Sequence, residues 1–301
     1  MQMQKDISCS DLAQERNAPL VGTATHGDLW FLVEYSGRWE AKAFQQSSLP
    51  LVVKEHLLDA AAAAKNGRIL LIRQTDSHRR PGLRFFIAQV DPQTPHLYEY
   101  QLEDPLDLLD LDLLAFAAGQ PGPSEHLSQE PLYLVCTNGL RDACCARLGP
   151  QVYQVLTEQA GEAVWQSSHI GGHNKAPVLL FFPHGLNYGR VTPQEANQVC
   201  LAYQRGEISL AHYRGRVCYP PPVQAAEYFW RVRNADTRLP GPQFGPEIST
   251  DAQTWQVPVQ DATGQSVEVI QIESWLSTEQ IAITCTGSKL APIETFTEFI
   301  P

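Results

Sequence analysis

Two cysteines and two histidines stand at spacings that suit metal chemistry. Cys136 ends the apolar run PLYLVC, and Cys145 follows after eight intervening residues, where a helix is expected to begin. His169 and His173 lie in the loop sequence HIGGH, directly after the next strand-like run. Thiolate and imidazole are the ligands that soft and borderline metals prefer. Because ligand-binding loops in an α/β sheet gather at strand ends, we expect these four side chains to share one site.

Each of these residues taken alone has an ordinary explanation. A cysteine at a strand end is more often part of a core than a ligand, and a single loop histidine is usually a hydrogen-bonded polar residue. The occurrence of all four after two strands favours a ligand set. No glutamate follows His169, which disfavours a zinc helix of the H-E-x-x-H type. Gly171 and Gly172 also disfavour helix, and they allow the backbone to approach a bulky inorganic group.

Two long stretches of the chain predict the elements that position these residues. Residues 28–113 contain a strand (DLWFLVEY), a helix (LVVKEHLLDAAAAAK) and three further strand-like runs (GRILLIRQ, GLRFFIAQV and HLYEYQL). Residues 127–233 repeat this order with PLYLVC, CARLGPQVYQVLTEQAG, EAVWQSS, PVLLFF, LNYGRV and PQEANQVCLAYQRG. The order β-α-β-β-β-α is the thioredoxin-like plan. FLVEYSGRWEAKA also aligns with YLVCTNGLRDACC, which places Glu34 and Ala43 opposite Cys136 and Cys145.

The sequence therefore predicts an α/β protein with two thioredoxin-like (β-α-β-β-β-α) halves, of which the second carries the site. The predicted domains are residues 1–117, without ligands, and residues 127–233, with the site. The Pro- and Gly-rich stretch 118–126 is predicted to link them. Residues 234–301 contain the alternating runs TWQVPVQ, QSVEVIQIESWL and QIAITCTG and are predicted to form a small C-terminal β element of unassigned role.

The stretch CTNGLRDACCARLG…VWQSSHIGGHNKAPVLLFFPHGLNYGRVTPQEA resembles the sucrase/ferredoxin-like family, a branch of the thioredoxin-like [2Fe–2S] ferredoxins. The resemblance extends over roughly residues 9–233. It implies a [2Fe–2S] cluster held by Cys136, Cys145, His169 and His173. Thioredoxin-like ferredoxins carry Cys-x3-Cys where this chain has His169 and His173. Cys144 is the alternative to Cys145, but relatives with one cysteine after the Arg-Asp pair place it at the position of Cys145.

This ligand set predicts one-electron transfer or redox sensing. Replacing two thiolates by neutral imidazoles removes negative charge and raises the reduction potential. Four protein ligands leave no position for a substrate, so an electron carrier is expected rather than a catalyst with its own substrate. Arg141 and Asp142 are expected either to brace the cluster loop as a pair or to be a solvated pair. Lys175 is expected to tune the potential through its charge.

Two other functions fit the same residues. A structural zinc site also uses two cysteines and two histidines, although zinc-binding cysteines are usually closer together than Cys136 and Cys145. A thiol oxidoreductase using Cys144 and Cys145 is the second alternative. It ranks last, because the usual signature is C-x-x-C and adjacent cysteines make a strained bridge.

Composition narrows the expected partners and location. The net charge of −11 argues against nucleic-acid and anionic-membrane binding, and no apolar run approaches the roughly 20 residues that span a bilayer. The N-terminal residues lack the pattern of a secretory signal, and seven cysteines in a chain of this length suit a reducing cytoplasm. A redox protein, either reductase or acceptor, is the expected partner, and the oligomeric state is left open.

Overall fold

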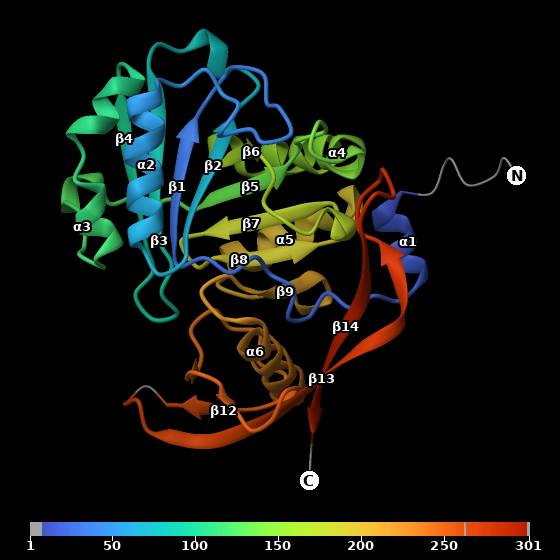
Figure 1. The fold of residues 1–301 in the computed structure, drawn as a ribbon. Helices are drawn as coiled ribbons and strands as arrows, with labels where there is room; N and C mark the ends of the chain where they lie inside the picture. The colour runs from blue at the N-terminus through green and yellow to red at the C-terminus, as the bar shows by residue number, and fades with distance from the viewer. Residues whose placement is uncertain (1–7, 262, 300–301) are drawn as a thin grey trace, which may run out of the picture.

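One nine-stranded mixed sheet dominates the computed structural model, which describes residues 8–261 and 263–299 (Figure 1). The outer ends of the first and third predicted domains therefore lie outside the described residues. The strand order is β4-β3-β1-β2-β6-β5-β7-β8-β9. The protein is thus a mixed α/β protein, as the sequence predicts.

The first block of this sheet contains four strands and two helices. They are β1 (Leu29–Glu34), α2 (Leu51–Ala63), β2 (Gly67–Arg73), β3 (Leu83–Gln89), β4 (His96–Leu102) and α3 (Leu113–Ala117). β1 pairs with β2 in parallel and with β3 antiparallel, and β4 lies outside β3. The predicted strands and the Ala-rich helix are confirmed, within one or two residues at their ends.

The second block repeats the order of the first. It contains β5 (Leu132–Cys136), α4 (Ala143–Ala160), β6 (Val164–Ser167), β7 (Val178–Phe182), β8 (Leu186–Gly189) and α5 (Pro193–Gln204). β5 is parallel to β6 and antiparallel to β7, and β8 lies outside β7. The predicted cap of α5 is present, with Thr192 and Glu195 forming a capping box around Pro193.

The two blocks join at β2 and β6, which pair antiparallel at Ile72–Ser167 and Arg73–Gln166. Alternate residues of a strand face opposite sides of a sheet, so Phe31 of β1 faces α2 while Trp30 faces the other block. The helix-free faces of both blocks meet in one shared core, where Trp30, Leu32, Phe86, Leu134, Trp165, Leu180 and Phe182 are buried. Each block therefore covers one face of its strands with helices and the other with its neighbour.

The C-terminal part adds a second sheet. The elements of this C-terminal part are β9 (Tyr213–Arg216), α6 (Pro221–Asn234), β10 (Gln243–Phe244), β11 (Ile248–Ser249), β12 (Thr254–Gln260), β13 (Ser266–Ala282) and β14 (Leu290–Phe299). β9 completes the large sheet, and α6 packs its buried side chains against the five-stranded second sheet. The prediction that QSVEVIQIESWL and QIAITCTG form separate runs is wrong, because both contribute to the single long strand β13.

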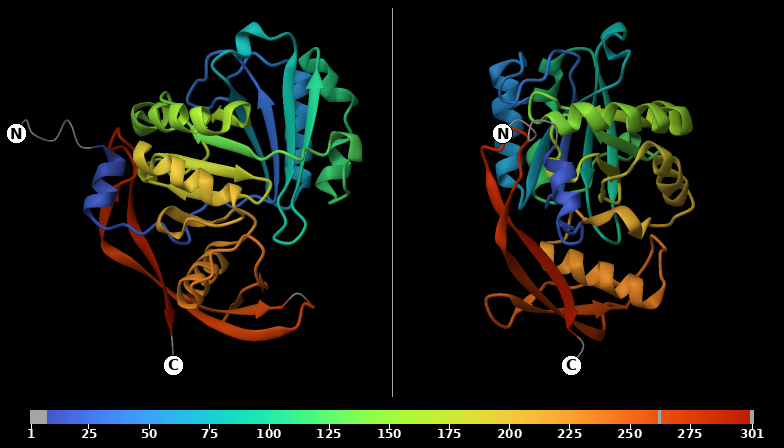
Figure 2. Two further views of the ribbon diagram at one scale, coloured as in Figure 1. Left: turned by 180° about the vertical axis from the view of Figure 1, so that it is seen from behind. Right: turned by 90° about the vertical axis from the view of Figure 1, so that its right-hand side faces the viewer.

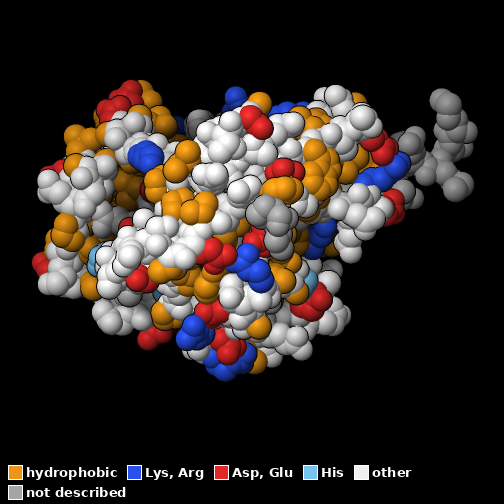
Figure 3. All heavy atoms as spheres, turned by 90° about the horizontal axis from the view of Figure 1, so that it is seen from below, with side chains coloured by type: hydrophobic (Ala, Val, Ile, Leu, Met, Phe, Trp, Pro, Cys, Tyr) orange, Lys and Arg blue, Asp and Glu red, His pale blue; other side chains and the backbone are white. Residues whose placement is uncertain are grey.

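The hairpin of β13 and β14 is the element that reaches back to the rest of the chain. Figures 1 and 2 show it rising from the small sheet to lie beside α1 (Cys9–Glu15). From below, acidic and basic side chains lie intermixed (Figure 3), and Arg233 of α6 pairs with Glu268 and Glu298 of the hairpin. Among the helices described, none is long and apolar enough to cross a bilayer.

Candidate metal centre

All four predicted ligand residues lie in the second block, at the end of β5, in the first turn of α4 and in the segment after β6. Cys136 is the last residue of β5, and Cys145 is in the first turn of α4. Their sulfur atoms are 3.4 Å apart. Cys136 Sγ lies 3.9 Å from His169 Nδ1, and His169 Nε2 lies 3.3 Å from His173 Nδ1. The four side chains therefore form a continuous row in which two thiols are followed by two imidazoles.

The two adjacent cysteines face different neighbours. Successive residues of a helix point about 100° apart, and the first turn of α4 directs Cys145 toward Cys136. Cys144 Sγ instead lies 3.4 Å from Cys9 Sγ and 3.0 Å from Cys285 Sγ. The structure thus places Cys145, and not Cys144, beside the other predicted ligands.

The chemical state of these side chains suits metal binding. The hydrogen bond between Cys136 and Cys145 holds the pKa of the Cys136 thiol well below its ordinary value, and His169 lowers this pKa further. The same hydrogen bond raises the pKa of Cys145. Burial lowers the pKa of His173, which keeps its ring neutral. Cys136 and Cys145 are each 1% exposed, so a metal group bound by these cysteines would be shielded from water on their side.

The loop between the histidines needs glycine because of protein neighbours as well as backbone shape. Gly171 and Gly172 have φ values of +121° and +72°, where other residues are strained. A side chain at Gly171 would collide with Thr25, and one at Gly172 would come 2.5 Å from Arg214 Nη2. The structure therefore gives protein neighbours as one reason for both glycines, and the close approach to an inorganic group stays a prediction.

Arg214 of β9 is a site residue that the sequence interpretation left without a role. Its guanidinium donates to the Gly171 carbonyl oxygen at 3.2 Å, to Thr23 Oγ1 at 3.1 Å and also to the Thr23 carbonyl oxygen. Burial lowers its pKa to about 9. Arg214 fastens the histidine loop to the N-terminal segment. A charged residue inside the strand sequence YRGR was the available signal.

Asp142 has different partners from those predicted. The expected pair with Arg141 is a wrong prediction: Arg141 is exposed, and among the residues described no ion pair joins it to Asp142. The carboxylate of Asp142 instead turns back to cap α4, accepting from the Cys144 N–H at 3.0 Å. It also accepts from the Cys285 N–H at 2.9 Å and lies 3.8 Å from His173 Nε2. Asp142 therefore connects the histidine loop with the turn between β13 and β14.

Lys175 lies just after the histidines, in the turn His173–Lys175. Its ammonium group donates to Asn174 Oδ1 at 3.4 Å. Burial, and after it the charges of Arg214 and Arg190, lowers the pKa of Lys175 to about 7. The role of Lys175 in tuning the reduction potential through its charge stays a prediction.

The position that corresponds to Cys136 in the first block carries a carboxylate. Glu34 is the last residue of β1, as Cys136 is of β5. It is buried, accepts from the Arg84 N–H at 2.7 Å and pairs with Arg80 at 3.1 Å. The carboxylate is thus satisfied by arginine and backbone groups of its own block.

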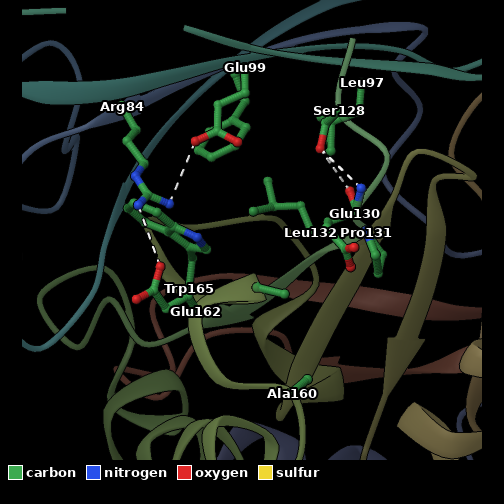
Figure 4. A pocket seen from close by; sticks show the side chains of 12 residues that line it. Arg84, Leu97, Glu99, Ser128, Glu130, Pro131, Leu132, Ala160, Glu162 and Trp165 are labelled. Carbon is green, nitrogen blue, oxygen red and sulfur yellow. Dashed lines mark hydrogen bonds and ion pairs between the residues drawn. The ribbon is translucent and has the colours of Figure 1, made fainter. Parts of the chain in front are cut away.

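A cavity of about 300 Å³ lies between the two blocks (Figure 4). Arg84 pairs with Glu99 of the neighbouring strand β4 and, across the cavity, with Glu162, each at 3.5 Å. None of the predicted ligand residues is among the residues that line it. Three of its charged residues, Arg84, Glu99 and Glu162, pair with one another, and no cysteine or histidine is among the described residues that line it.

Comparison with known proteins gives one match that spans both blocks. The model of the sucrase/ferredoxin-like family matches residues 20–215, a range that includes Cys136, Cys145, His169 and His173. The Altered inheritance of mitochondria protein 32 of Meyerozyma guilliermondii is 32% identical over 99 residues, which are 29% of this chain and 35% of that protein. Two serine variants of the thioredoxin-like [2Fe–2S] ferredoxin from Aquifex aeolicus are 17% identical, with 28% of this chain and 97% of each ferredoxin covered. Their TM-scores are 0.26 and 0.25.

Proposed function

This chain belongs to the sucrase/ferredoxin-like family, and from that membership we propose that it binds a [2Fe–2S] cluster and acts in one-electron transfer or redox sensing. The proposed ligands are Cys136, Cys145, His169 and His173. The observation that carries the proposal is their arrangement as a buried thiol pair beside an imidazole pair. When bound, the cluster supplies a one-electron couple, whose potential two imidazole ligands raise relative to four thiolates.

The shape of the donor set supports a two-iron group over a single zinc ion. The shortest contacts run from Cys145 to Cys136 to His169 to His173, at 3.4, 3.9 and 3.3 Å. Cys136, Cys145 and His169 can each bring a ligand atom within 4.8 Å of the others, and His173 extends this group beyond His169. A single tetrahedral ion needs four donors around one point, whereas two irons suit an elongated set.

The surrounding residues hold the ligands in place. Arg214 ties the histidine loop to Thr23, and Asp142 places a carboxylate near the outer nitrogen of His173. A carboxylate at this position orients a ligating imidazole and increases its basicity. His173 Nε2 is buried without a hydrogen-bond partner among the residues described, and Asp142 Oδ2 lies 3.8 Å from it.

The repeated strand order suggests how the site arose. In both blocks the chain order is β-α-β-β-β. In both, the strands lie next to one another in the spatial order second, first, third, fourth. We infer that they are diverged copies of one thioredoxin-like unit and that only the second copy kept the ligands. We also propose that the partner is a second redox protein, reductase or acceptor, in the reducing cytoplasm.

The test is to purify the full chain without oxygen and to measure iron, acid-labile sulfide and visible absorption. About two irons and two sulfides per chain, with a red-brown colour, are expected. A colourless protein with zinc bound by Cys136 and His169 would refute the cluster. A colourless, metal-free protein that reduces disulfides would favour the thiol oxidoreductase.

A substitution tests the imidazole ligands directly. His169→Cys should retain the cluster and lower its reduction potential, because a thiolate adds negative charge next to iron. His78→Cys is the matched control, since His78 is exposed and lies on a turn of the first block. A potential that is the same in both variants would mean that His169 is not a ligand.

A further inference from the structure

Three cysteines that the cluster does not use meet at a second point. Cys9 begins α1, Cys144 lies in the first turn of α4, and Cys285 lies in the turn between β13 and β14. Their sulfur atoms are separated by 3.4 Å (Cys9–Cys144), 3.0 Å (Cys144–Cys285) and 3.5 Å (Cys285–Cys9). Three segments that are far apart in the sequence therefore deliver one thiol each to the same place.

A carboxylate completes the group. Asp142 Oδ1 lies 3.6 Å from Cys9 Sγ, and the four residues can bring ligand atoms that all lie within 4.8 Å of one another. Cys9 and Cys144 are 2% and 0% exposed, and Asp142 is 6% exposed. Cys285 is half-buried. Four donors around one point are the number and arrangement of a structural zinc site, which accepts thiolate and carboxylate ligands. We propose that Cys9, Cys144, Cys285 and Asp142 bind one zinc ion, forming a three-cysteine site distinct from the cluster.

Two simpler explanations account for less of this arrangement. Cysteines often pack as small apolar residues, and Ala176 and Leu148 do lie against these three. The Asp142 carboxylate has a role as the cap of α4, but apolar packing does not require three sulfur atoms from distant segments to meet within 3.5 Å of one another. A disulfide joins two sulfurs at about 2.05 Å and leaves the third without a partner. In a tetrahedral zinc site all three sulfurs lie about 3.8 Å apart, which follows from a bond of about 2.3 Å to the ion. The observed triangle is slightly smaller than that.

Zinc also fits the chemistry of the donors better than a second redox centre does. All four donors surround one point, which leaves space for a single ion. Thiolates favour zinc over the hard cations. On binding, the three thiols release their protons to solvent and the zinc keeps its oxidation state, so the step needs no oxidant or reductant.

The three-cysteine site would join parts of the chain that the family match does not include. Cys9 and Cys285 both lie outside residues 20–215. Cys285 donates its N–H to Asp142, and Asp142 also lies 3.8 Å from His173 of the proposed cluster. Zinc at this position would fasten α1 and the tip of the β13–β14 hairpin against the histidine loop. The C-terminal extension then acts as a cover for the redox centre.

The test is a metal analysis of the anaerobically purified full chain. The native protein should contain one zinc per chain in addition to the cluster iron. Cys285→Ser should lower the zinc content at least fivefold and keep the iron and visible absorption. Cys136→Ser is the matched control, because it should lose iron and keep zinc. Iron therefore reports on the proposed cluster and zinc on the three-cysteine site, so failure of one is distinguishable from failure of the other.

Three results would overturn the zinc site. The first is an equal zinc content in Cys285→Ser and in the native protein. The second is a zinc-free native protein whose mass is lower by two hydrogens, which would indicate a disulfide. The third is a zinc-free native protein of full mass, which would indicate packed thiols. X-ray absorption of zinc in the native protein tests the same idea even if the Cys285→Ser variant does not fold. Three sulfurs at about 2.3 Å and one oxygen are expected. Two sulfurs and two nitrogens would place the zinc at the histidines instead and refute the proposal.

Discussion

Glu227 of α6 provides a sharp test of how the C-terminal part is attached to the large sheet. Its side chain is 1% exposed and lies 3.4 Å from Arg216 of β9 and 3.1 Å from Arg231 of α6. Tyr213 donates its hydroxyl to the same carboxylate at 2.8 Å. Glu227→Gln keeps the shape and removes the charge, which leaves two buried guanidinium groups without a counter-charge. Breaking a buried ion pair in this way costs about 3–5 kcal/mol.

Urea unfolding measures this loss. With a slope of about 3 kcal/mol per molar urea, the midpoint should fall by roughly 1 to 1.7 M. The matched control is Glu207→Gln, because Glu207 pairs with Arg205 at 2.8 Å and both side chains are well exposed. An exposed pair contributes about 1 kcal/mol or less. Equal midpoint shifts for the two variants would refute the stabilising role of the buried network.

The same network predicts a pH dependence. Burial opposes ionisation of Glu227, but Arg216, Arg231 and the Tyr213 hydroxyl outweigh it and hold the pKa of this carboxyl below its ordinary value. The folded pKa thus lies below the unfolded value of about 4.3. The stabilisation is therefore fully present above that pH and is lost as pH falls through the folded pKa. The difference between the native protein and Glu227→Gln should be smaller at pH 3.5 than at pH 7, and a constant difference would contradict this.

Three further predictions concern other parts of the chain. Gly172→Ala should lower the thermal midpoint and the iron content, because the new methyl group would collide with Arg214 and would also sit at a strained φ of +72°. Gly206→Ala is the control, because it has only the backbone strain, at a φ of +76°. Equal losses of thermal midpoint and iron content in the two variants would contradict this. Burial lowers the pKa of His184 to about 4, below the unfolded value of about 6.5, so stability should fall as pH drops from 6.5 toward 4, and His184→Gln should flatten this profile in thermal unfolding. Burial raises the pKa of the Cys218 thiol to about 12, so iodoacetamide at pH 8 should modify it only in unfolded protein; labelling of native protein, read by mass spectrometry, would oppose this.

Secondary structure was largely predictable because the local signals are strong. The apolar runs of β1, β3 and β7 are buried on both faces, which is why they read as continuous hydrophobic stretches. The joining of β2 to β6 and the core shared by the two blocks were not predictable. Pairing between strand edges depends on backbone hydrogen bonds, which leave no mark in the side-chain pattern.

The long strand β13 shows a second limit. Its outer portion is half exposed and polar, so its sequence resembles two short runs separated by a turn. Pairing with β14 over most of its length keeps it extended. The strand exists because of its partner, and the sequence of β13 alone does not contain that information.

The sequence by itself determined which residue types can hold a metal. Cys136, Cys145, His169 and His173 were recognisable because thiol and imidazole groups followed two strand ends at short spacing. The tertiary structure decided which of two adjacent cysteines faces them, since the first turn of α4 directs Cys145 and Cys144 to different neighbours. It also brought Cys9 and Cys285, 276 residues apart, to Cys144. Such long-range proximity depends on the packing of whole elements, and no local pattern encodes it.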